Sequence, residues 1–323
     1  MKISITGASG HIGTNLCRAL LERGDSLKVL INQYTGSLEG LGLERVQGNL
    51  LDPGSLRRLA EGSEIFIHLA ASISINGDRN VLETNYQGTR HVLEAVRKSG
   101  VRRLVHFSSI HALVHEPLNE ALDETRALAF EDRIPYNRSK ALAEQAVREA
   151  VAGGIDAVII NPTSVLGPND FKPSLIGQAL LQLYRGKIPA LVPGGYNWVD
   201  VRDVVSGTLS AMEKGRRGES YLLSGHFVNL PDLYKMLLEL KGSGRKLPVL
   251  PFWLAETGVP FLKAWAGLTG SEPLYTSESI KILKTAHPGI SSAKAAGEFG
   301  YRARPFEETL EDTLKWFRDM HYL

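Results

Sequence analysis

A tyrosine and a lysine stand four residues apart in the segment Tyr136-Asn137-Arg138-Ser139-Lys140. This segment opens a stretch of helical periodicity, and residues at this spacing project from the same face of a helix. A tyrosine hydroxyl has an ordinary pKa of about 10, and a nearby lysine ammonium would favour the phenolate and lower that pKa. Such a pair could exchange a proton with an oxygen atom of a bound molecule. The spacing by itself is common, and most such pairs are surface neighbours on a helix.

Two serines end an apolar stretch upstream of that tyrosine. Leu104 to Phe107 is predicted to form a buried strand, and Ser108 and Ser109 follow it directly. In a doubly wound sheet, ligands bind at the carboxyl ends of the strands. A serine there could hydrogen-bond a carbonyl or hydroxyl oxygen and hold it beside Tyr136, although two ordinary loop residues would look the same. The combination predicts a site for carbonyl or alcohol chemistry.

A glycine-rich loop joins the first predicted strand to the first predicted helix. It reads TGASGHIG from Thr6 to Gly13, with glycines at Gly7, Gly10 and Gly13. In this position, glycines let backbone N–H groups and the helix dipole face a pyrophosphate with no Cβ in the way. Three glycines alone would also suit a tight turn. Their place directly after the first strand of an alternating α/β chain predicts a dinucleotide site.

The end of the second predicted strand bears on the choice between NAD and NADP. A carboxylate there accepts a bond from the ribose 2′-hydroxyl of NAD, and an arginine there pairs with the 2′-phosphate of NADP. This chain has neither, because Leu30-Ile31 is followed by Asn32, and no Lys or Arg occurs between Lys28 and Arg45. Asn32 could bond a ribose hydroxyl, whereas a phosphate needs charged partners. The sequence therefore favours NAD, with NADP left open.

The order of the predicted elements shows how these residues could come together. Strands are predicted over 2–6, 27–31, 43–47, 65–70, 104–107 and 157–161, and helices over 12–22, 81–98 and 136–152. This alternation implies right-handed crossovers and a parallel, doubly wound α/β sheet, the Rossmann fold. After Pro162, proline and glycine become frequent. We expect a dinucleotide-binding domain over 1–166 with a return segment at about 190–226, and a smaller substrate-binding lobe over 167–189 and 227–323.

The composition limits the class of protein. Of 323 residues, 43% are apolar and 22% are charged, with a net charge of +2, which is ordinary globular usage and does not indicate nucleic-acid binding. The single cysteine, Cys17, excludes a disulfide framework, and no His or acidic cluster has metal-ligand spacing, so no metal is expected. No run of about 18 apolar residues occurs, so we expect no membrane segment and a soluble, cytoplasmic protein.

Together these motifs resemble an extended short-chain dehydrogenase/reductase of the NAD-dependent epimerase/dehydratase family. Within that family, the chain is most similar in character to the dihydroflavonol-reductase-like branch. Matching motifs span nearly the whole chain: Thr6–Gly13, Gly48–Asp52, His68–Ala71, Asn85–Thr89, Ser108–Ser109, Tyr136–Lys140, Asn161–Thr163, Trp198–Asp203 and Phe299–Tyr301. Because they occur in order and at workable spacing, a chance match is very improbable.

The resemblance implies a role for each matching position. Tyr136 would be the acid/base, and Lys140 would lower its pKa. Ser109 would orient the substrate, and Asn85 would lie on the nicotinamide side. The implied cofactor-binding positions are Gly7, Ser9, Gly10, His11, Ile12, Gly13, Asn32, Asn49, Leu50, Leu69, Ala70, Ala71, Tyr136, Lys140 and Pro162. Family members commonly pair through the helix that carries the tyrosine and its neighbour, so the resemblance also implies a homodimer.

The same residues serve several reactions on small-molecule substrates. A reductase or dehydrogenase transfers hydride once, whereas a nucleotide-sugar 4-epimerase removes hydride and returns it to the opposite face. A 4,6-dehydratase of this family usually adds an acid near the serine, but the residues after Ser109 are Ile110-His111-Ala112. His111 lies close to the expected substrate and is a candidate substrate contact. A third possibility is a non-catalytic NAD(P)-binding regulator, a class that commonly loses the tyrosine.

The second lobe bears on the choice of substrate. A nucleotide diphosphate needs cations, and those available there are Arg185, Lys187, Arg202 and Lys214. Against this, the lobe is rich in aromatic residues, namely Phe252, Trp253, Phe261, Trp265 and Tyr275. Aromatic side chains suit an apolar ring or aldehyde substrate, although they could simply pack the lobe's own core. The sequence therefore favours an NAD(P)-dependent carbonyl reductase or alcohol dehydrogenase over a sugar epimerase.

Overall fold

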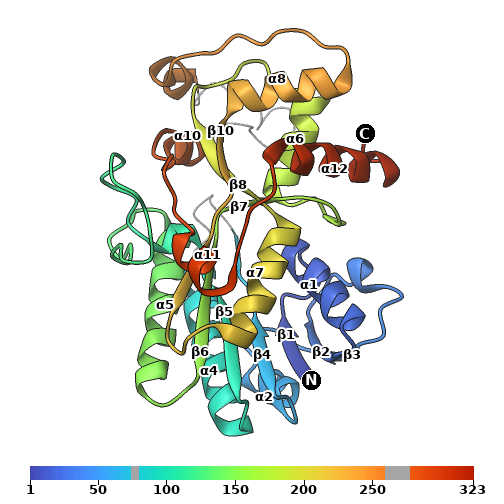
Figure 1. Cartoon of the computed structure of the whole chain (residues 1–323), viewed down its shortest axis with the longest axis vertical. Coiled ribbons are helices and arrows are strands. Elements are labelled where there is room, and N and C mark those ends of the chain that lie inside the picture. The colour runs from blue at the N-terminus through green and yellow to red at the C-terminus, as the bar shows by residue number, and fades with distance from the viewer. Residues whose placement is uncertain (74–79, 259–276) are drawn as a thin grey trace.

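A seven-stranded parallel sheet forms the centre of the molecule (Figure 1). The structure is a computed structural model and describes residues 1–73, 80–258 and 277–323. The strands lie in the order β3-β2-β1-β4-β5-β6-β9, and each neighbouring pair is parallel. Their bounds are β1 (Lys2–Thr6), β2 (Ser26–Ile31), β3 (Glu44–Gln47), β4 (Ile65–His68), β5 (Arg103–Phe107), β6 (Ala157–Pro162) and β9 (Ser220–Leu223). The order reverses between β1 and β4, which confirms the predicted Rossmann fold.

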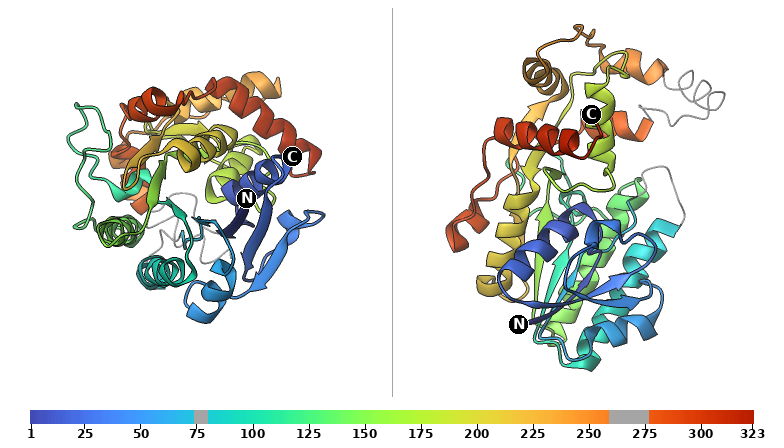
Figure 2. Two further views of the ribbon diagram at one scale, coloured as in Figure 1. Left: turned by 60° about the horizontal axis from the view of Figure 1, so that its bottom comes forward. Right: turned by 90° about the vertical axis from the view of Figure 1, so that its right-hand side faces the viewer.

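Helices cover both faces of this sheet (Figure 2). One face carries α1 (His11–Glu22), α7 (Val201–Lys214) and α11 (Ala293–Phe299), and the other carries α2 (Pro53–Ala60), α4 (Gly88–Ser99) and α5 (Pro135–Ala152). Each helix turns an apolar stripe to the strands, for example Leu16 and Leu20 of α1 on one face and Val92 and Val96 of α4 on the other. Strands buried on both faces read as continuous apolar runs, which is why the sequence located them well.

Two stretches differ from the sequence prediction. A seventh strand, β9, pairs parallel with β6 and lies in the expected return segment. The helix predicted over 81–98 runs instead as α3 (Asn80–Leu82), a π-helical turn (Glu83–Gln87) and α4. A π turn inserts one residue into a helix, and periodicity over a short window does not reveal it. Such turns are frequent at functional sites.

A second lobe lies beyond the carboxyl ends of the parallel strands (Figure 1). It contains a three-stranded sheet in the order β10-β8-β7, with β7 (Ser164–Leu166), β8 (Gly195–Asp200) and β10 (His226–Asn229). Of these, β7 and β8 fall in the ranges 1–166 and 190–226 that the sequence assigned to the dinucleotide-binding domain. Its helices include α6 (Leu175–Tyr184), α8 (Leu230–Lys241), α10 (Ser277–Lys284) and α12 (Phe306–Asp319). Trp198, Leu237 and Phe317 are buried in an apolar core that belongs to this lobe. The lobe is therefore a packed unit placed over the edge of the sheet where ligands bind.

Ion pairs fix the first turn of α7 between the two parts. Arg202 pairs with Asp200 and with Asp312 of α12, both at 2.7 Å, and Arg304 pairs with Asp203 at 2.8 Å. The carboxylates of Asp200, at the end of β8, and of Asp203, in α7, are both buried, so each needs a charged partner to be stable there. Arg202, one of the cations considered for phosphate binding, is thus already paired within the protein.

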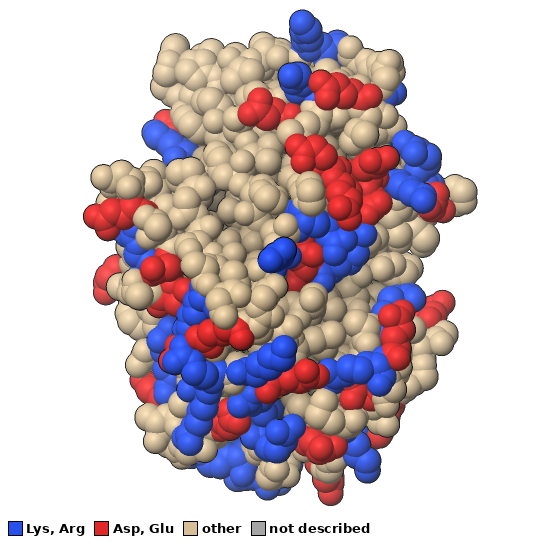
Figure 3. All heavy atoms as spheres, in the orientation of Figure 1, with Lys and Arg blue, Asp and Glu red and all other residues tan. Residues whose placement is uncertain are grey.

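The surface shows mixed charge over the sheet-bearing half of the molecule (Figure 3). Within the described ranges, no helix is long and apolar enough to cross a membrane. Among the aromatic residues expected in the second lobe, Trp253 is 65% exposed and so does not pack the lobe core. Phe261, Trp265 and Tyr275 lie outside the described residues.

Candidate functional site

Three of the predicted site residues lie together where β5 meets α5. Ser109 follows β5 and precedes a short 3-10 helix (Ile110–Ala112), Tyr136 lies in the first turn of α5, and Lys140 lies one turn later. Pro135, whose fixed φ suits the first helical position, starts α5 directly before the tyrosine. All three side chains are at least nine-tenths buried, and the Ser109 side chain hydrogen-bonds that of Tyr136.

Burial decides the titration of Tyr136. It raises the pKa of the Tyr136 hydroxyl, and the hydrogen bond with Ser109 opposes that rise. The sequence predicted the opposite direction, on the assumption that the Lys140 ammonium contacts the phenol. Instead, Lys140 Nζ donates to the carbonyl oxygen of Phe107 at 2.9 Å, at the end of β5. Burial of the phenol therefore sets the direction of the Tyr136 pKa in this structure, and the predicted role of Lys140 toward Tyr136 stays a prediction.

Lys140 itself has an unusual environment for a lysine. Burial lowers the pKa of its ammonium to about 8, and the carboxylate of Glu144, one turn further along α5, opposes this change. An exposed lysine has a pKa of about 10.4 and stays charged at all physiological pH values. Lys140 can therefore gain or lose a proton close to neutral pH, which is typical of functional lysines.

Glu144 was missed by the sequence reasoning and links the helix to the serine. Its carboxylate is fully buried, and Oε1 accepts a hydrogen bond from Arg148 Nη2 at 2.7 Å. Oε2 accepts from Asn161 Nδ2 at 2.9 Å, and the same amide donates to the backbone oxygen of Ser109 at 3.1 Å. The signal in the sequence was its spacing, four residues after Lys140 and so on the same face of the predicted helix.

Asn85 occupies the π-helical turn and holds together two parts of the site. Its Oδ1 accepts from the Ser72 N–H at 2.7 Å, and its Nδ2 donates to the Ser72 carbonyl at 3.0 Å and to Ser139 Oγ at 2.9 Å. Ser139 Oγ in turn donates to the Tyr136 carbonyl at 2.7 Å. Asn85 therefore connects the segment after β4 to the first turn of α5. Its predicted place beside a nicotinamide stays a prediction.

The glycine loop has the shape that a pyrophosphate requires. Gly7 has φ +76°, and a Cβ there would lie 2.6 Å from the backbone nitrogen of Ala70. A Cβ on Gly13 would lie 2.1 Å from the carbonyl oxygen of Gly7. Gly10 caps α1 without a side-chain hydrogen bond, and no acid stands in the first turn of the helix. The N–H groups of that turn are thus open to an anion, so the loop fits the phosphates of a dinucleotide.

The other predicted cofactor positions follow the carboxyl ends of the same strands. Asn32 follows β2, Asn49 and Leu50 follow β3, Leu69, Ala70 and Ala71 follow β4, Pro162 ends β6, and Ser9, His11 and Ile12 lie between β1 and the first turn of α1. Two of these side chains have partners within the protein. Asn49 Oδ1 accepts from the Leu51 N–H at 2.8 Å, and His11 Nε2 lies 3.0 Å from the Pro168 oxygen. Their binding roles stay predictions.

The structure adds a cation near the end of β2. Lys172, from the segment before α6, places Nζ 5.7 Å from the ring centroid of Tyr34, two residues after Asn32. The sequence favoured NAD because no base stands close to Asn32 along the chain. In three dimensions a base from the second lobe approaches the same region, so the choice between NAD and NADP stays open.

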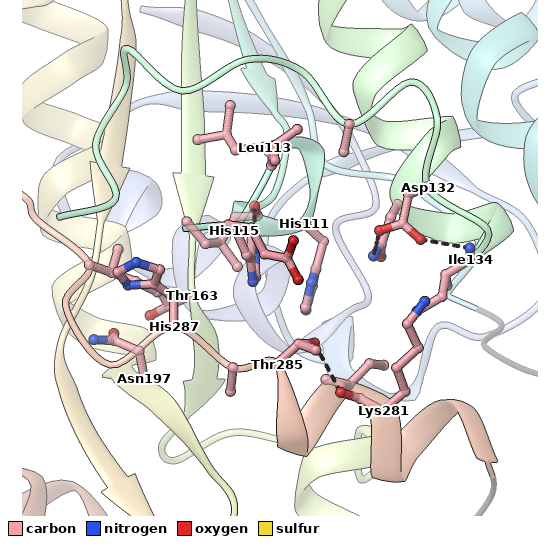
Figure 4. Close-up of a pocket in the computed structure, with 18 of the residues that line it drawn as sticks. His111, Leu113, His115, Asp132, Ile134, Thr163, Asn197, Lys281, Thr285 and His287 are labelled. Carbon is pink, nitrogen blue, oxygen red and sulfur yellow. Dashed lines mark hydrogen bonds between the residues drawn. The ribbon is translucent and has the colours of Figure 1, made fainter. Parts of the chain in front are cut away.

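A cavity of about 520 Å³ opens beside His111 (Figure 4). It lies between the segments that precede α5 and the residues of α10 and just after it. Its apolar lining residues are Ile110, Leu113, Val114, Leu128, Ala129, Phe130, Ile134, Ile282, Ala286 and Ile290. The ring of His111 meets that of Tyr136 edge-on, with centroids 6.2 Å apart. The cavity therefore adjoins the Ser109–Tyr136 pair.

The environment of His111 makes its imidazole a neutral group. The ring stacks on that of His115 with centroids 5.5 Å apart, and both line the cavity. Burial lowers the pKa of His111 to about 4, with a smaller contribution from His115 in the same direction. At neutral pH the ring can donate or accept a hydrogen bond without carrying charge. This placement supports the predicted substrate contact, which stays a prediction.

Comparison with known proteins gives consistent matches over the chain. Residues 3–224 match the model of the NAD dependent epimerase/dehydratase family. Sterol demethylase protein B of Methylococcus capsulatus is 36% identical over 326 residues, covering 99% of each chain. A Synechocystis protein named "Putative dihydroflavonol 4-reductase" is 32% identical, covering 99% of this chain and 95% of its own. The crystal structure of gox2253 has a TM-score of 0.86 and 31% identity, covering 100% of this chain and 99% of the other.

Proposed function

The chain belongs to the NAD-dependent epimerase/dehydratase family, and we propose that it interconverts a carbonyl and an alcohol in an apolar, ring-containing small molecule. The observation that carries this proposal is the buried Ser109–Tyr136–Lys140 set, which adjoins a largely apolar cavity. Members of this family are enzymes, and the glycine loop of this chain fits the pyrophosphate of the cofactor.

Ser109 and Tyr136 act together on the substrate oxygen. A bound nicotinamide cofactor supplies or takes up the hydride. In the reductive direction, the Ser109 hydroxyl hydrogen-bonds the carbonyl oxygen and Tyr136 gives its proton to that oxygen. Burial raises the pKa of Tyr136, so the phenol is protonated at neutral pH and ready to act as an acid. The charge of protonated Lys140 stabilises the Tyr136 phenolate, which forms when Tyr136 gives up its proton in reduction and which takes up a proton in oxidation.

The cavity supports an apolar substrate over a nucleotide sugar. None of the four cations considered for phosphate binding is among the described residues that line it. Two of them are engaged within the protein, because Arg202 pairs with Asp200 and Arg185 donates to the Tyr322 carbonyl at 2.6 Å. One relative is named for a sterol and another for a dihydroflavonol, and both of these are ring compounds. A reductase or dehydrogenase of a ring ketone or alcohol therefore fits this chain best.

A Tyr136→Phe variant tests the proposal. Wild type and variant are supplied with NADH and NADPH in turn, and absorbance at the nicotinamide band is followed with a panel of ring ketones, aldehydes and nucleotide sugars. We expect wild type to reduce ring ketones and the variant to lose at least about a hundredfold in rate, the usual effect of removing an acid. A Tyr184→Phe variant in α6, outside the cavity, is the matched control. Wild type and Tyr136→Phe that are equally inert while binding cofactor would overturn the proposal.

The same panel decides between the alternatives. Turnover of nucleotide sugars alone, without net oxidation of NADH, would favour the 4-epimerase. Direct titration with both reduced cofactors settles the cofactor, and we propose NAD because Asn32 is exposed and carries no charge. A Lys172→Met variant measures how much Lys172 contributes to NADPH binding. Gel filtration with light scattering tests the expected homodimer.

A further inference from the structure

His287 presents an unused hydrogen-bonding atom to the cavity. It follows α10 and lines the cavity, yet only 2% of its surface is exposed. Its Nδ1 accepts a hydrogen bond from the Gly289 N–H at 3.0 Å. Its Nε2 is buried and has no hydrogen-bond partner among the described residues. Buried polar atoms without partners are uncommon in folded proteins and call for an explanation.

The Gly289 contact fixes which nitrogen of His287 carries the proton. A ring nitrogen that accepts from a backbone N–H must be unprotonated, so in the neutral ring the proton lies on Nε2. Nε2–H is therefore a donor that lacks an acceptor. A donor buried in this way destabilises the protein, and a ligand oxygen that accepts a hydrogen bond from it would remove that cost.

Two more unpartnered polar atoms belong to the same cavity lining. Thr163 Oγ1 and Asn137 Oδ1 are buried without partners in the described part of the chain. Asn137 Nδ2 is already used, because it donates to Asp132 Oδ2 at 2.9 Å. Figure 4 draws His287 and Thr163 at one end of the cavity and Asp132 with Lys281 at the other. The end that carries His287 thus combines a donor with a hydroxyl that can donate or accept.

We propose that His287 recognises a second, uncharged oxygen of the substrate by donating a hydrogen bond from Nε2, with Thr163 as a further partner. The inference rests on the proposed function, in which Ser109 and Tyr136 hold the first oxygen. The substrate class is then a ring ketone or alcohol that bears an additional carbonyl or hydroxyl group.

The charges around the cavity favour an uncharged group at His287 over a carboxylate. Three acids line the cavity, Glu116, Glu131 and Asp132, against two bases, Arg133 and Lys281. Both bases are exposed and are in contact with solvent, so they offer little charge to a buried anion. A buried carboxylate needs a charged partner, whereas a neutral oxygen needs only the donor that His287 provides.

The test measures equilibrium binding, so it does not depend on turnover. Four probes are titrated into the enzyme saturated with oxidised cofactor: cyclohexanone, 4-methoxycyclohexanone, cyclohexane-1,4-dione and 4-oxocyclohexanecarboxylate. The proteins are wild type, His287→Phe, which keeps a ring but removes the donor, and His226→Phe, an exposed site outside the cavity as a control. We expect the uncharged second oxygen to tighten binding about tenfold in wild type and His226→Phe. This gain should vanish in His287→Phe.

Several results would overturn the inference. These are equal binding of all four probes, no binding of any probe, tightest binding of the carboxylate, or a gain that survives in His287→Phe. Thermal unfolding of His287→Phe shows whether the variant is misfolded. Nitrogen-15 NMR of the wild type gives an independent check, because it shows which ring nitrogen of His287 carries the proton. A His287 proton found on Nδ1 instead of Nε2 would also refute the inference. Absence of hydride transfer in both wild type and Tyr136→Phe would count against the proposed function alone, and the binding results could still be interpreted.

Discussion

Replacing Glu144 by Gln tests whether the buried carboxylate keeps Lys140 charged. The substitution removes one negative charge one turn from Lys140 and keeps an oxygen that can accept from Asn161, which holds the Ser109 backbone. The geometry of the serine is therefore preserved while the charge is lost. Glu149, nine residues after Lys140 and exposed on the same helix, gives the control variant Glu149→Gln with the same change in charge.

The expected size of the effect follows from the pKa of Lys140, which is about 8 with Glu144 in place. Loss of a neighbouring opposite charge raises the acid dissociation constant of a lysine about tenfold, at the low end of the observed range. The protonated fraction of Lys140 then falls from about nine-tenths to about one-half at pH 7, and about ninefold at pH 9. The loss of activity should therefore grow steadily as the pH rises.

The assay is the rate of NADH-dependent reduction between pH 6 and pH 9, with the best ketone of the panel. We expect Glu144→Gln to lose about half the rate at pH 7 and about nine-tenths at pH 9, whereas Glu149→Gln follows wild type. An unchanged pH profile in Glu144→Gln would show that Glu144 does not act through the charge of Lys140. The same shift of the pH profile in Glu149→Gln would also refute this role of Glu144, because the shift would then arise from the net charge of the protein.

Three further predictions concern Lys140, the glycine loop and the cysteine. Because burial lowers the pKa of Lys140 from 10.5 to about 8, its charge destabilises the fold below pH 8 by about 3 kcal/mol, and this cost fades as the pH rises to 10.5. Urea unfolding of wild type and Lys140→Met should therefore show wild type gaining stability relative to the variant between pH 7 and pH 10, and a constant difference would contradict this. Gly13→Ala should weaken NADH binding at least tenfold in a fluorescence titration, because its Cβ meets the Gly7 carbonyl oxygen, whereas Gly297→Ala, where a Cβ meets nothing within 4 Å, should bind normally. Burial raises the pKa of the Cys17 thiol to about 12, so a disulfide reagent should label it only after unfolding, and rapid labelling of the native protein would count against the described core.

The sequence alone determined six of the seven strands of the large sheet, the glycine loop and the common helix face of Tyr136 and Lys140. Strands such as β1 and β5 are buried on both faces, so their continuous apolar runs can be recognised from the sequence alone. The glycine loop can be recognised in the sequence because only glycine fits at Gly7 and Gly13, where an added Cβ would lie within 3 Å of backbone atoms. The spacing of Tyr136 and Lys140 gave their common helix face directly. These features are local, and local features are what periodicity and residue type encode.

The tertiary structure decided the environment of each of these groups. Lys140 donates to a strand carbonyl 33 residues earlier in the chain, and burial raises the pKa of Tyr136. Glu144 reaches Ser109 only through Asn161, and Lys172 reaches Tyr34 from another lobe. Burial sets the titration of all these groups, and burial depends on what the distant parts of the chain place around them.

The cavity beside His111 also belongs to the tertiary structure alone. His287 stands 176 residues after His111 in the chain, and both line the same space. The residue types around each histidine do not indicate that the other lines the same cavity. Only packing of the second lobe over the carboxyl edge of the sheet brings them together. The motifs that identify the family are therefore local, whereas the proposed substrate depends on contacts between segments far apart in the sequence.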